Sequence, residues 1–420
     1  MTRHRQHNSD QNNNTVLLFL ICLLILSLIV MGAFFSGLIP WGQQKQLPAS
    51  PPPVLYGDVE FHTGWIDDQD AVKTSLISVE QIQGFIAKWA EVFVEEEDND
   101  HPVFLWATEE KVLGKMLPSW NQGQIGSCVA HGWGRACQDL ILIQIVAGGK
   151  EEWPGAEVCR ETIYGGSRVE AGHDGGGGDG STGGWAAQWC SEWGVLFYKK
   201  YGNVDLADGY NVSRCKQYGS RGVPDELESV AKEHPVKGVA KVTSAEQAWQ
   251  ALGSGYPIPI CSNVGFQSPL VDGFCKRSGS WAHCMEIRAR FVHPTRGRCF
   301  VIQNSWGDYL AKEGGDPEID VKGQGKVKLP QGCFGITSAD ADVILRQNDS
   351  YAISSFRGFP ARKIDWLIKR PQIQENRYGR GQIKKDRHDI AAPWRRQGAG
   401  FGSHSGLEWL DRKQFAWERN

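Results

Sequence analysis

Residues 121–131 read Asn-Gln-Gly-Gln-Ile-Gly-Ser-Cys-Val-Ala-His, and this stretch decides the fold. A turn of small residues brings Cys128 to the start of an apolar pattern, which predicts a helix over 128–146 that ends at a glycine pair. The unpaired N–H groups and the dipole of a helix N-terminus stabilise a thiolate, the reactive form of cysteine. Gln122 is placed to return its amide toward the same point, as an oxyanion donor beside the Cys128 N–H. The alternative is an inert, buried cysteine.

Two later segments favour the catalytic alternative. His283 stands at the start of a strand-like run, and Asn304 stands at the end of another. A cysteine nucleophile needs a base for its proton, and the base needs an acceptor that orients its second ring nitrogen. His283 follows Cys128 by 155 residues and Asn304 follows it by 176. This is the order of papain-type peptidases, at slightly longer spacing.

At these residues the chain resembles the papain family of cysteine peptidases. Residues 122–128, Gln-Gly-Gln-Ile-Gly-Ser-Cys, are similar to the family's Gln-Gly-x-Cys-Gly-Ser-Cys motif, and residues 304–307 match its Asn-Ser-Trp-Gly motif. Residues 332–336, Gly-Cys-Phe-Gly-Ile, are similar to its closing Cys-Gly-Ile segment. The resemblance covers 105–347 and implies a two-lobed α+β fold. A helical left lobe would carry the cysteine and a β-rich right lobe the histidine and asparagine, with the substrate cleft between them.

The resemblance also implies a role for each motif residue. Cys128 would be the nucleophile, and His283 would act first as base and then as acid. Asn304 would orient His283, and Gln122 would help to bind the oxyanion. Trp306 would shield the hydrogen bond between Asn304 and His283 from water, where that bond is stronger.

A glycine-rich run at 175–184 occupies the place where the family has a glycine pair that hydrogen-bonds extended substrate. Glycine suits close approach of two backbones. Gly183 and Gly184 match the pair by residue type, whereas Gly180 and Ser181 fit its spacing better. The run is not a phosphate-binding loop, because no Gly-Lys-Ser/Thr follows it.

Several positions depart from the family pattern. Ile125 replaces a cysteine that the family usually pairs, and 160–189 contains no cysteine to pair with it. Val129 stands where tryptophan is usual, and Ala282 stands where Asn or Asp commonly precedes the histidine. None of these removes a catalytic atom, but they affect substrate preference. His131 has two interpretations, a second titrating group near the thiolate or a hydrogen-bonded interior histidine, and we favour the interior one.

Outside this region the chain divides into an anchor, a spacer and a tail. Val16 to Ile39 is an uncharged apolar run of 24 residues, about 36 Å as a helix, which is enough to cross a bilayer. It is too long for a signal peptide, so we expect an uncleaved anchor. Arg3 and Arg5 then place the N-terminus in the cytoplasm and the body outside. The alternative is a cleaved segment and a secreted body.

The expected organisation follows from these divisions. It comprises a cytoplasmic N-terminus (1–15), a transmembrane anchor (16–39), a Pro-rich spacer with a short helical segment (40–104), the peptidase domain (105–347) and a basic, mostly disordered tail (348–420).

Within the body, helical patterns come first and strand patterns later, which favours α+β over a doubly wound sheet. A capping-box pattern, Ser-Val-Glu-Gln at 78–81, predicts a helix near 79–95. Further helices are expected at 185–193 and 244–253. The expected strands lie at 256–261, 285–292, 299–303 and 326–329.

Charge and composition limit the partners. The net charge is −3, but residues 351–420 alone hold 15 Lys/Arg and 7 Asp/Glu, so the rest of the chain is acidic and nucleic acid is an unlikely partner for it. The tail is either solvated or binds an anionic partner such as nucleic acid or a lipid surface. His173 and Asp174 are too few for a metal site, so no metal and no cofactor are expected. The 11 cysteines include some that would pair if the body is extracytoplasmic.

The sequence therefore predicts a cysteine endopeptidase whose Cys128 forms a thioacyl-enzyme, with polypeptide as substrate. Two alternatives remain open: a non-catalytic, membrane-tethered peptide-binding protein, and a peptidase that processes itself or one partner.

Overall fold

The computed structural model describes residues 53–56, 59–83, 100–148, 153–173, 178–309 and 317–355. The predicted anchor at 16–39 and most of the predicted tail lie outside these residues. Within the described ranges, no helix combines the length and apolarity needed to span a bilayer.

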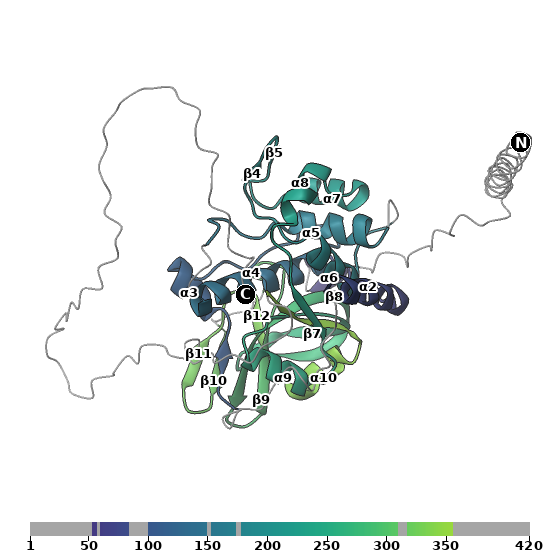
Figure 1. Ribbon diagram of the computed structural model, residues 1–420. Coiled ribbons are helices and arrows are strands. Elements are labelled where there is room, and N and C mark those ends of the chain that lie inside the picture. The colour runs from purple at the N-terminus through teal and green to yellow at the C-terminus, as the bar shows by residue number, and fades with distance from the viewer. Residues whose placement is uncertain are drawn as a thin grey trace, which may run out of the picture. The chain divides into compact units, whose positions relative to one another are not determined.

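Helices form one layer of the body, above the sheet in the view of Figure 1. The long α4 (Cys128–Gly148) runs along the sheet, and nearly all of its residues up to Gln144 are buried. The other helices of this part are α2 (Gln69–Gln83), α3 (Ala107–Leu113), α5 (Arg160–Gly166), the π-helical turn η2 (Ser167–Ala171), α6 (Gly183–Glu192), α7 (Val212–Arg221) and α8 (Asp225–Ala231).

A seven-stranded sheet forms the second layer, in the order β12-β9-β8-β7-β13-β6 with β3 on β8. Its pairings are antiparallel apart from a single parallel bridge between β12 and β8. The strands are β3 (Val103–Phe104), β6 (Gly238–Lys241), β7 (Ile258–Val271), β8 (Phe274–His293), β9 (Gly297–Gln303), β12 (Cys333–Thr337) and β13 (Asp349–Ser354).

Two helices and three small hairpins complete the body. Helices α9 (Ala245–Gly253) and α10 (Ser338–Leu345) contribute Trp249 and Ile344 to a core shared with the central strands. The hairpins pair β1 (Val54–Tyr56) with β2 (Val59–Phe61), β4 (Lys200–Tyr201) with β5 (Val204–Asp205), and β10 (Glu318–Val321) with β11 (Gly325–Lys328).

Strand β8 lies in the middle of the sheet, and the side chains on its two faces differ in chemistry. Met285 and Ile287 enter the apolar core shared with α9 and α10, whereas Arg288 contacts Asp139 of α4. A register shift between Ile287 and Ala289 then reverses the alternation, and Arg290 donates to the Trp249 carbonyl of α9. A bulge that adds a residue to one strand has this effect on the facing of later side chains.

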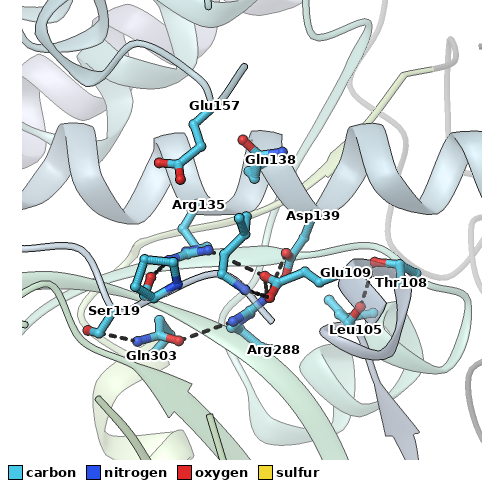
Figure 2. Close-up of polar contacts among 12 residues, drawn as sticks. Leu105, Thr108, Glu109, Ser119, Arg135, Gln138, Asp139, Glu157, Arg288 and Gln303 are labelled. Atoms are coloured by element: carbon cyan, nitrogen blue, oxygen red, sulfur yellow. Dashed lines mark hydrogen bonds and ion pairs between the residues drawn. The ribbon is translucent and has the colours of Figure 1, made fainter. Parts of the chain in front are cut away.

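Buried ion pairs join α3 and α4 to β8, as Figure 2 shows. Arg288 Nη2 lies 2.6 Å from Glu109 Oε1 and 2.7 Å from Asp139 Oδ1, and all three side chains have zero exposure. Arg135 adds a second cation 3.3 Å from Glu109 Oε1, and Gln303 Oε1 accepts from Arg288. Such a network holds the layers together because each buried charge has a partner of opposite sign.

The α+β class and most predicted elements are confirmed. The cysteine helix begins at Cys128 as predicted, and α6 and α9 lie within two residues of their predicted bounds. Of the predicted strands, 256–261, 285–292, 299–303 and 326–329 fall in or beside β7, β8, β9 and β11.

The helix predicted near 79–95 differs from the structure. Helix α2 begins ten residues earlier, at Gln69, and residues 84–95 lie outside the described residues. Its N-terminus is capped by Asp68, whose Oδ1 accepts from the N–H groups of Asp70 and Ala71. Ser78 is no cap, because its hydroxyl donates to the Thr74 carbonyl within the helix.

The folded body also extends past both expected boundaries of 105–347. Strand β13 pairs with β6 and β7 inside the central sheet, so the sheet continues into the expected tail. On the N-terminal side, α2 packs on α6, and Val72 and Val79 are fully buried.

Candidate active site

Cys128 is the first residue of α4 and its side chain is fully buried. The turn before it is held by Asp179, whose Oδ2 accepts from the Gly126 N–H at 2.6 Å. The first helical hydrogen bond runs from the His131 N–H to the Ser127 carbonyl. The thiol therefore sits at the helix N-terminus that the sequence predicts.

His283 of β8 is fixed by Asn304, which directly follows β9. The distance from His283 Nε2 to Asn304 Oδ1 is 2.8 Å, and both side chains are buried. The amide orientation follows from its other contacts, since Oδ1 accepts from the Ser305 N–H and Nδ2 donates to the Tyr309 hydroxyl. An amide oxygen only accepts, so Nε2 carries the proton and, in the neutral ring, Nδ1 holds the lone pair. Nδ1 is buried without a hydrogen-bond partner among the described residues.

Two tryptophans border this pair. The Trp306 ring lies 4.6 Å from the His283 ring between centroids, and the Trp281 ring lies 4.7 Å from Trp306. Trp306 is therefore where the resemblance expects it, over the histidine beside Asn304.

Gln122 presents its amide nitrogen beside the cysteine turn. Nε2 donates to the Ile125 carbonyl at 2.9 Å and to the His62 carbonyl at 3.0 Å. Its Oε1 accepts from the Ser305 hydroxyl at 2.7 Å, which fixes which end of the amide faces the two carbonyls. Both amide hydrogens thus already bind backbone carbonyls in this state.

Burial controls the ionisation of the cysteine and the histidine. Burial raises the pKa of the Cys128 thiol well above its usual range, and the nearby Cys284 adds to this, although N–H groups of Cys284 and Gly64 act against it. Burial lowers the pKa of His283 to about 4, opposed by the hydrogen bond to Asn304. At neutral pH both groups are therefore uncharged in this state.

Residues 61–66, called here the covering segment, lie over these groups. The N–H groups of Gly64 and Trp65 lie 3.0 and 2.9 Å from the Ala282 carbonyl, beside His283. On the other side, the Ser181 N–H donates to the Gly64 carbonyl and the Ile66 N–H donates to the Ser181 carbonyl, which forms a parallel bridge. The segment is thus bonded to both layers of the body.

The N-terminal end of the covering segment, Phe61 and His62, contacts Gln122 and Trp306. The His62 carbonyl accepts from Trp306 Nε1 at 3.2 Å as well as from Gln122, and the Phe61 ring stacks on Trp306 at 4.7 Å. A Cβ on Gly64 would overlap the Gly126 carbonyl, so only glycine fits this close approach.

The downstream end of the covering segment is anchored in the core. Trp65 is 2% exposed, and its Nε1 donates to Asp349 Oδ2 at 2.7 Å. The same carboxylate oxygen accepts from the Gly183 N–H at the start of α6.

The structure separates the two glycine candidates. Gly180, at φ +108°, and Ser181 lie against Gly64 of the covering segment. Gly183 and Gly184 lie instead at the start of α6, against Asp349 and the backbone of Val72. Of the two pairs, Gly180 and Ser181 are therefore the pair that lies against Gly64 of the covering segment.

Of the other sequence candidates, His131 lies in the first turn of α4, close to these groups. The His131 ring is buried with Nδ1 3.0 Å from the Ser127 carbonyl, which matches the interior interpretation, and burial lowers its pKa well below the usual range. All ten cysteines that the structure describes are free. No group of metal-ligating side chains is found among the described residues.

Sequence reasoning missed the covering segment and two supporting residues. Asp179 and Tyr309 hold the Gly126 turn and Asn304, but isolated Asp and Tyr residues carry no motif. For the segment, a cluster of aromatic residues around Gly64 (Phe61, His62 and Trp65) was the available signal.

Comparison with known proteins finds similar chains among solved structures. No family model and no curated protein matches this chain. Similar solved structures include xylellain, a cysteine protease from Xylella fastidiosa, with 16% identity, a TM-score of 0.39 and coverage of 64% of this chain and 93% of that one. Procathepsin L 3 of Tenebrio molitor larval midgut gives 13%, 0.39, 67% and 79%. The bromelain protease from Ananas comosus gives 12%, 0.34, 60% and 98%. These structural neighbours are papain-like cysteine proteases.

Proposed function

We propose that this protein is a cysteine endopeptidase described here in a covered, latent state. One observation carries the proposal. Within the part of the chain that the structure describes, His283 has its protonated Nε2 bound to Asn304 and its Nδ1 without a hydrogen-bond partner. The next residue is Cys284, whose N–H reaches the Cys128 sulfur. A base oriented by a third group beside a thiol at a helix N-terminus is the arrangement that nucleophilic catalysis requires.

In this mechanism Cys128 passes its proton to His283 Nδ1 and attacks a peptide carbonyl. The oxyanion is bound by Gln122 Nε2 and the Cys128 N–H. His283 then protonates the leaving amine, and a thioacyl-enzyme remains on Cys128. Finally, His283 takes a proton from water, the resulting hydroxide attacks the thioester, and Cys128 leaves as the free thiol.

The covering segment supports a polypeptide substrate. It is an extended stretch whose backbone N–H and C=O groups bind the backbones of Ser181 and Ala282 and the side-chain amide of Gln122. These hydrogen bonds do not depend on the side chains of the covering segment. A substrate needs the same donors and acceptors, so the segment must leave before a substrate binds. Its departure also rehydrates Cys128 and His283, which moves both pKa values back toward their ordinary range.

The experiment compares the full chain with Trp65→Ala, which removes the buried anchor of the covering segment. We expect peptide hydrolysis and labelling by a thiol-directed probe to rise in Trp65→Ala and to vanish in Trp65→Ala/Cys128→Ala. Ile77→Ala is the matched control, because Ile77 is 49% exposed on the neighbouring α2. Labelling that persists without Cys128, or a Trp65→Ala protein that is inert to substrate and probe, would contradict the proposal.

For location, we propose an anchor at 16–39 with the peptidase body on the extracytoplasmic side. The support is the uncharged run of 24 residues after Arg3 and Arg5. N-terminal sequencing of the mature protein tests it, since a new N-terminus after residue 39 would indicate a cleaved, secreted form.

A further inference from the structure

Three cysteines lie in a row where α4 packs on the sheet: Cys128 of α4, Cys284 of β8 and Cys261 of β7. Cys261 of β7 and Cys284 of β8 are directly opposed in the antiparallel register, and their thiols are within hydrogen-bond reach. The Cys284 N–H in turn reaches the sulfur of Cys128. All three side chains are buried.

The Cys284 thiol points at the helix that carries Cys128. A Cβ placed on Gly132 would lie 2.9 Å from Cys284 Sγ and 2.8 Å from the Met285 carbonyl, so β8 lies directly against α4 at this point. Gly132 is four residues after Cys128, which puts both on the same helix face, one turn apart. The Cys284 sulfur therefore lies within one helical turn of the Cys128 side chain.

Catalysis gives the Cys284 side chain no task. Its backbone N–H contacts the Cys128 sulfur, and its own sulfur contacts the Cys261 thiol and, at 3.9 Å, the Met285 carbonyl. A smaller apolar residue would fill the same place on β8. A thiol here adds a redox partner one turn from the nucleophile.

We propose that Cys284 is the resolving thiol for Cys128, so that oxidation closes a reversible Cys128–Cys284 disulfide and switches the peptidase off. The proposal rests on the proposed function in taking Cys128 as the reactive thiol. The disulfide itself is observable whether or not peptide hydrolysis is detected.

The chemistry balances with hydrogen peroxide as the oxidant. The Cys128 thiolate attacks one peroxide oxygen, the O–O bond breaks, and Cys128 sulfenic acid and hydroxide form. The Cys284 sulfur then attacks the sulfenic sulfur, the S–O bond breaks, and the hydroxide that leaves takes the thiol proton as water. The hydroxide from the first step takes up the proton that Cys128 lost on becoming a thiolate. Two thiols thus lose one electron each, and the peroxide is reduced to two waters. A dithiol reductant reverses the step by exchange.

The covering segment makes this switch depend on the state of the site. With the segment in place, the Gly64 N–H reaches the Cys128 sulfur and the thiol is buried and protonated. Oxidation is therefore expected mainly once the segment has moved away.

The experiment treats the full chain and Trp65→Ala with hydrogen peroxide, blocks remaining thiols with iodoacetamide and maps linked peptides without reduction. In Trp65→Ala we expect a Cys128–Cys284 linked peptide that dithiothreitol removes. Adding Cys284→Ser is expected to abolish the link and to leave Cys128 as a dimedone-reactive sulfenic acid or a sulfinic acid. Cys261→Ser, one position farther along the row, is the matched control and is expected to retain the link.

Each other outcome overturns the proposal. These are a link that joins Cys261 to Cys284 instead, equal over-oxidation of Cys128 with and without Cys284, or no link in Trp65→Ala. If the link forms but no variant hydrolyses peptides, the redox inference stands and the proposed function fails.

Discussion

Helix α4 meets strand β8 at two places that differ in how their polar groups are satisfied. About three turns from the helix N-terminus, Asp139 and Glu109 surround Arg288 at 2.6–2.8 Å with no exposure to solvent. At the N-terminus itself, Cys128 and His283 are equally buried, but both are uncharged, and no described residue hydrogen-bonds to His283 Nδ1.

On the proposed function, the difference separates a structural interface from a reactive one. Around Arg288 the charge is compensated by Glu109 and Asp139, so removing one of these partners is costly. The neighbouring Glu286 is buried in the same place, and burial raises the pKa of its carboxyl well above the usual range. At the cysteine end, the buried His283 Nδ1 has no hydrogen-bond partner among the described residues, which is destabilising because burial of an unpaired acceptor costs free energy. Such groups are retained where chemistry uses them.

The largest expected effect is on kcat, when the buried acceptor His283 Nδ1 is removed. In the Trp65→Ala background, His283→Ala should lower kcat for peptide hydrolysis by about 10²- to 10⁴-fold, because the thiol loses its base. Steady-state kinetics on a peptide substrate measure this. Thermal stability should not fall in parallel, since the histidine is buried at a cost. Activity within twofold of the parent would remove His283 from the mechanism.

The next largest effect is on the free energy of unfolding, when the buried Arg288 cation is removed. Arg288→Met leaves Glu109 and Asp139 buried without compensation and should lower the free energy of unfolding by about 3–5 kcal/mol. Urea unfolding measures it. Arg298→Met is the matched control, because Arg298 is 34% exposed in its pairs with Asp100 and Glu246 and should cost about 1 kcal/mol or less. Equal losses in the two variants would erase the contrast between the regions.

The pH dependence of the free energy of unfolding tests whether His283, at the cysteine end of α4, is buried in its neutral form. The pKa of His283 is lowered to about 4, below the ordinary value of 6.5, so the unfolded chain takes up a proton first as pH falls. Stability from this residue is therefore complete above pH 6.5 and is lost between about 6.5 and 4, by up to about 3 kcal/mol.

Replacement of His283 tests that dependence directly. His283→Gln should show a shallower loss of stability than the parent over this pH range, measured by urea unfolding at several pH values. The lowered pKa of buried His131 gives a loss of the same sign that remains in both proteins. Identical pH profiles would show that His283 is not buried neutral.

The smallest expected effect concerns the turn that positions Cys128. Asp179→Ala leaves the Gly126 N–H without its acceptor and should cost about 1–3 kcal/mol of stability. Asp205→Ala is the matched control, because that carboxylate caps the Ala207 N–H in an exposed turn and should cost less. Thermal unfolding measures both, and a cost for Asp179→Ala no larger than for the control would show that the turn holds without this carboxylate.

Local patterns predicted the elements that carry their own signals. The helix at Cys128 follows from a small-residue turn, an apolar run and a terminal glycine pair. The hydrogen bond between His283 and Asn304 was expected from the family resemblance. Asn304 directly follows β9 as predicted, whereas His283 lies within β8 and not at the start of a strand. Helix α2 was misplaced because Asp68 is a single-residue cap, whereas Ser78 offered a stronger pattern inside the helix.

The sequence by itself determined the α+β class and the start of the cysteine helix, and it singled out the candidate site residues, because each depends on a few neighbouring residues or on one motif. Only the tertiary structure decided which glycine pair borders the site, that residues 61–66 cover it, and that Cys284 lies against the cysteine helix. These depend on backbone hydrogen bonds and close approach between segments far apart in the chain. A backbone carbonyl is the same in every residue, so the sequence carries no mark of its partner.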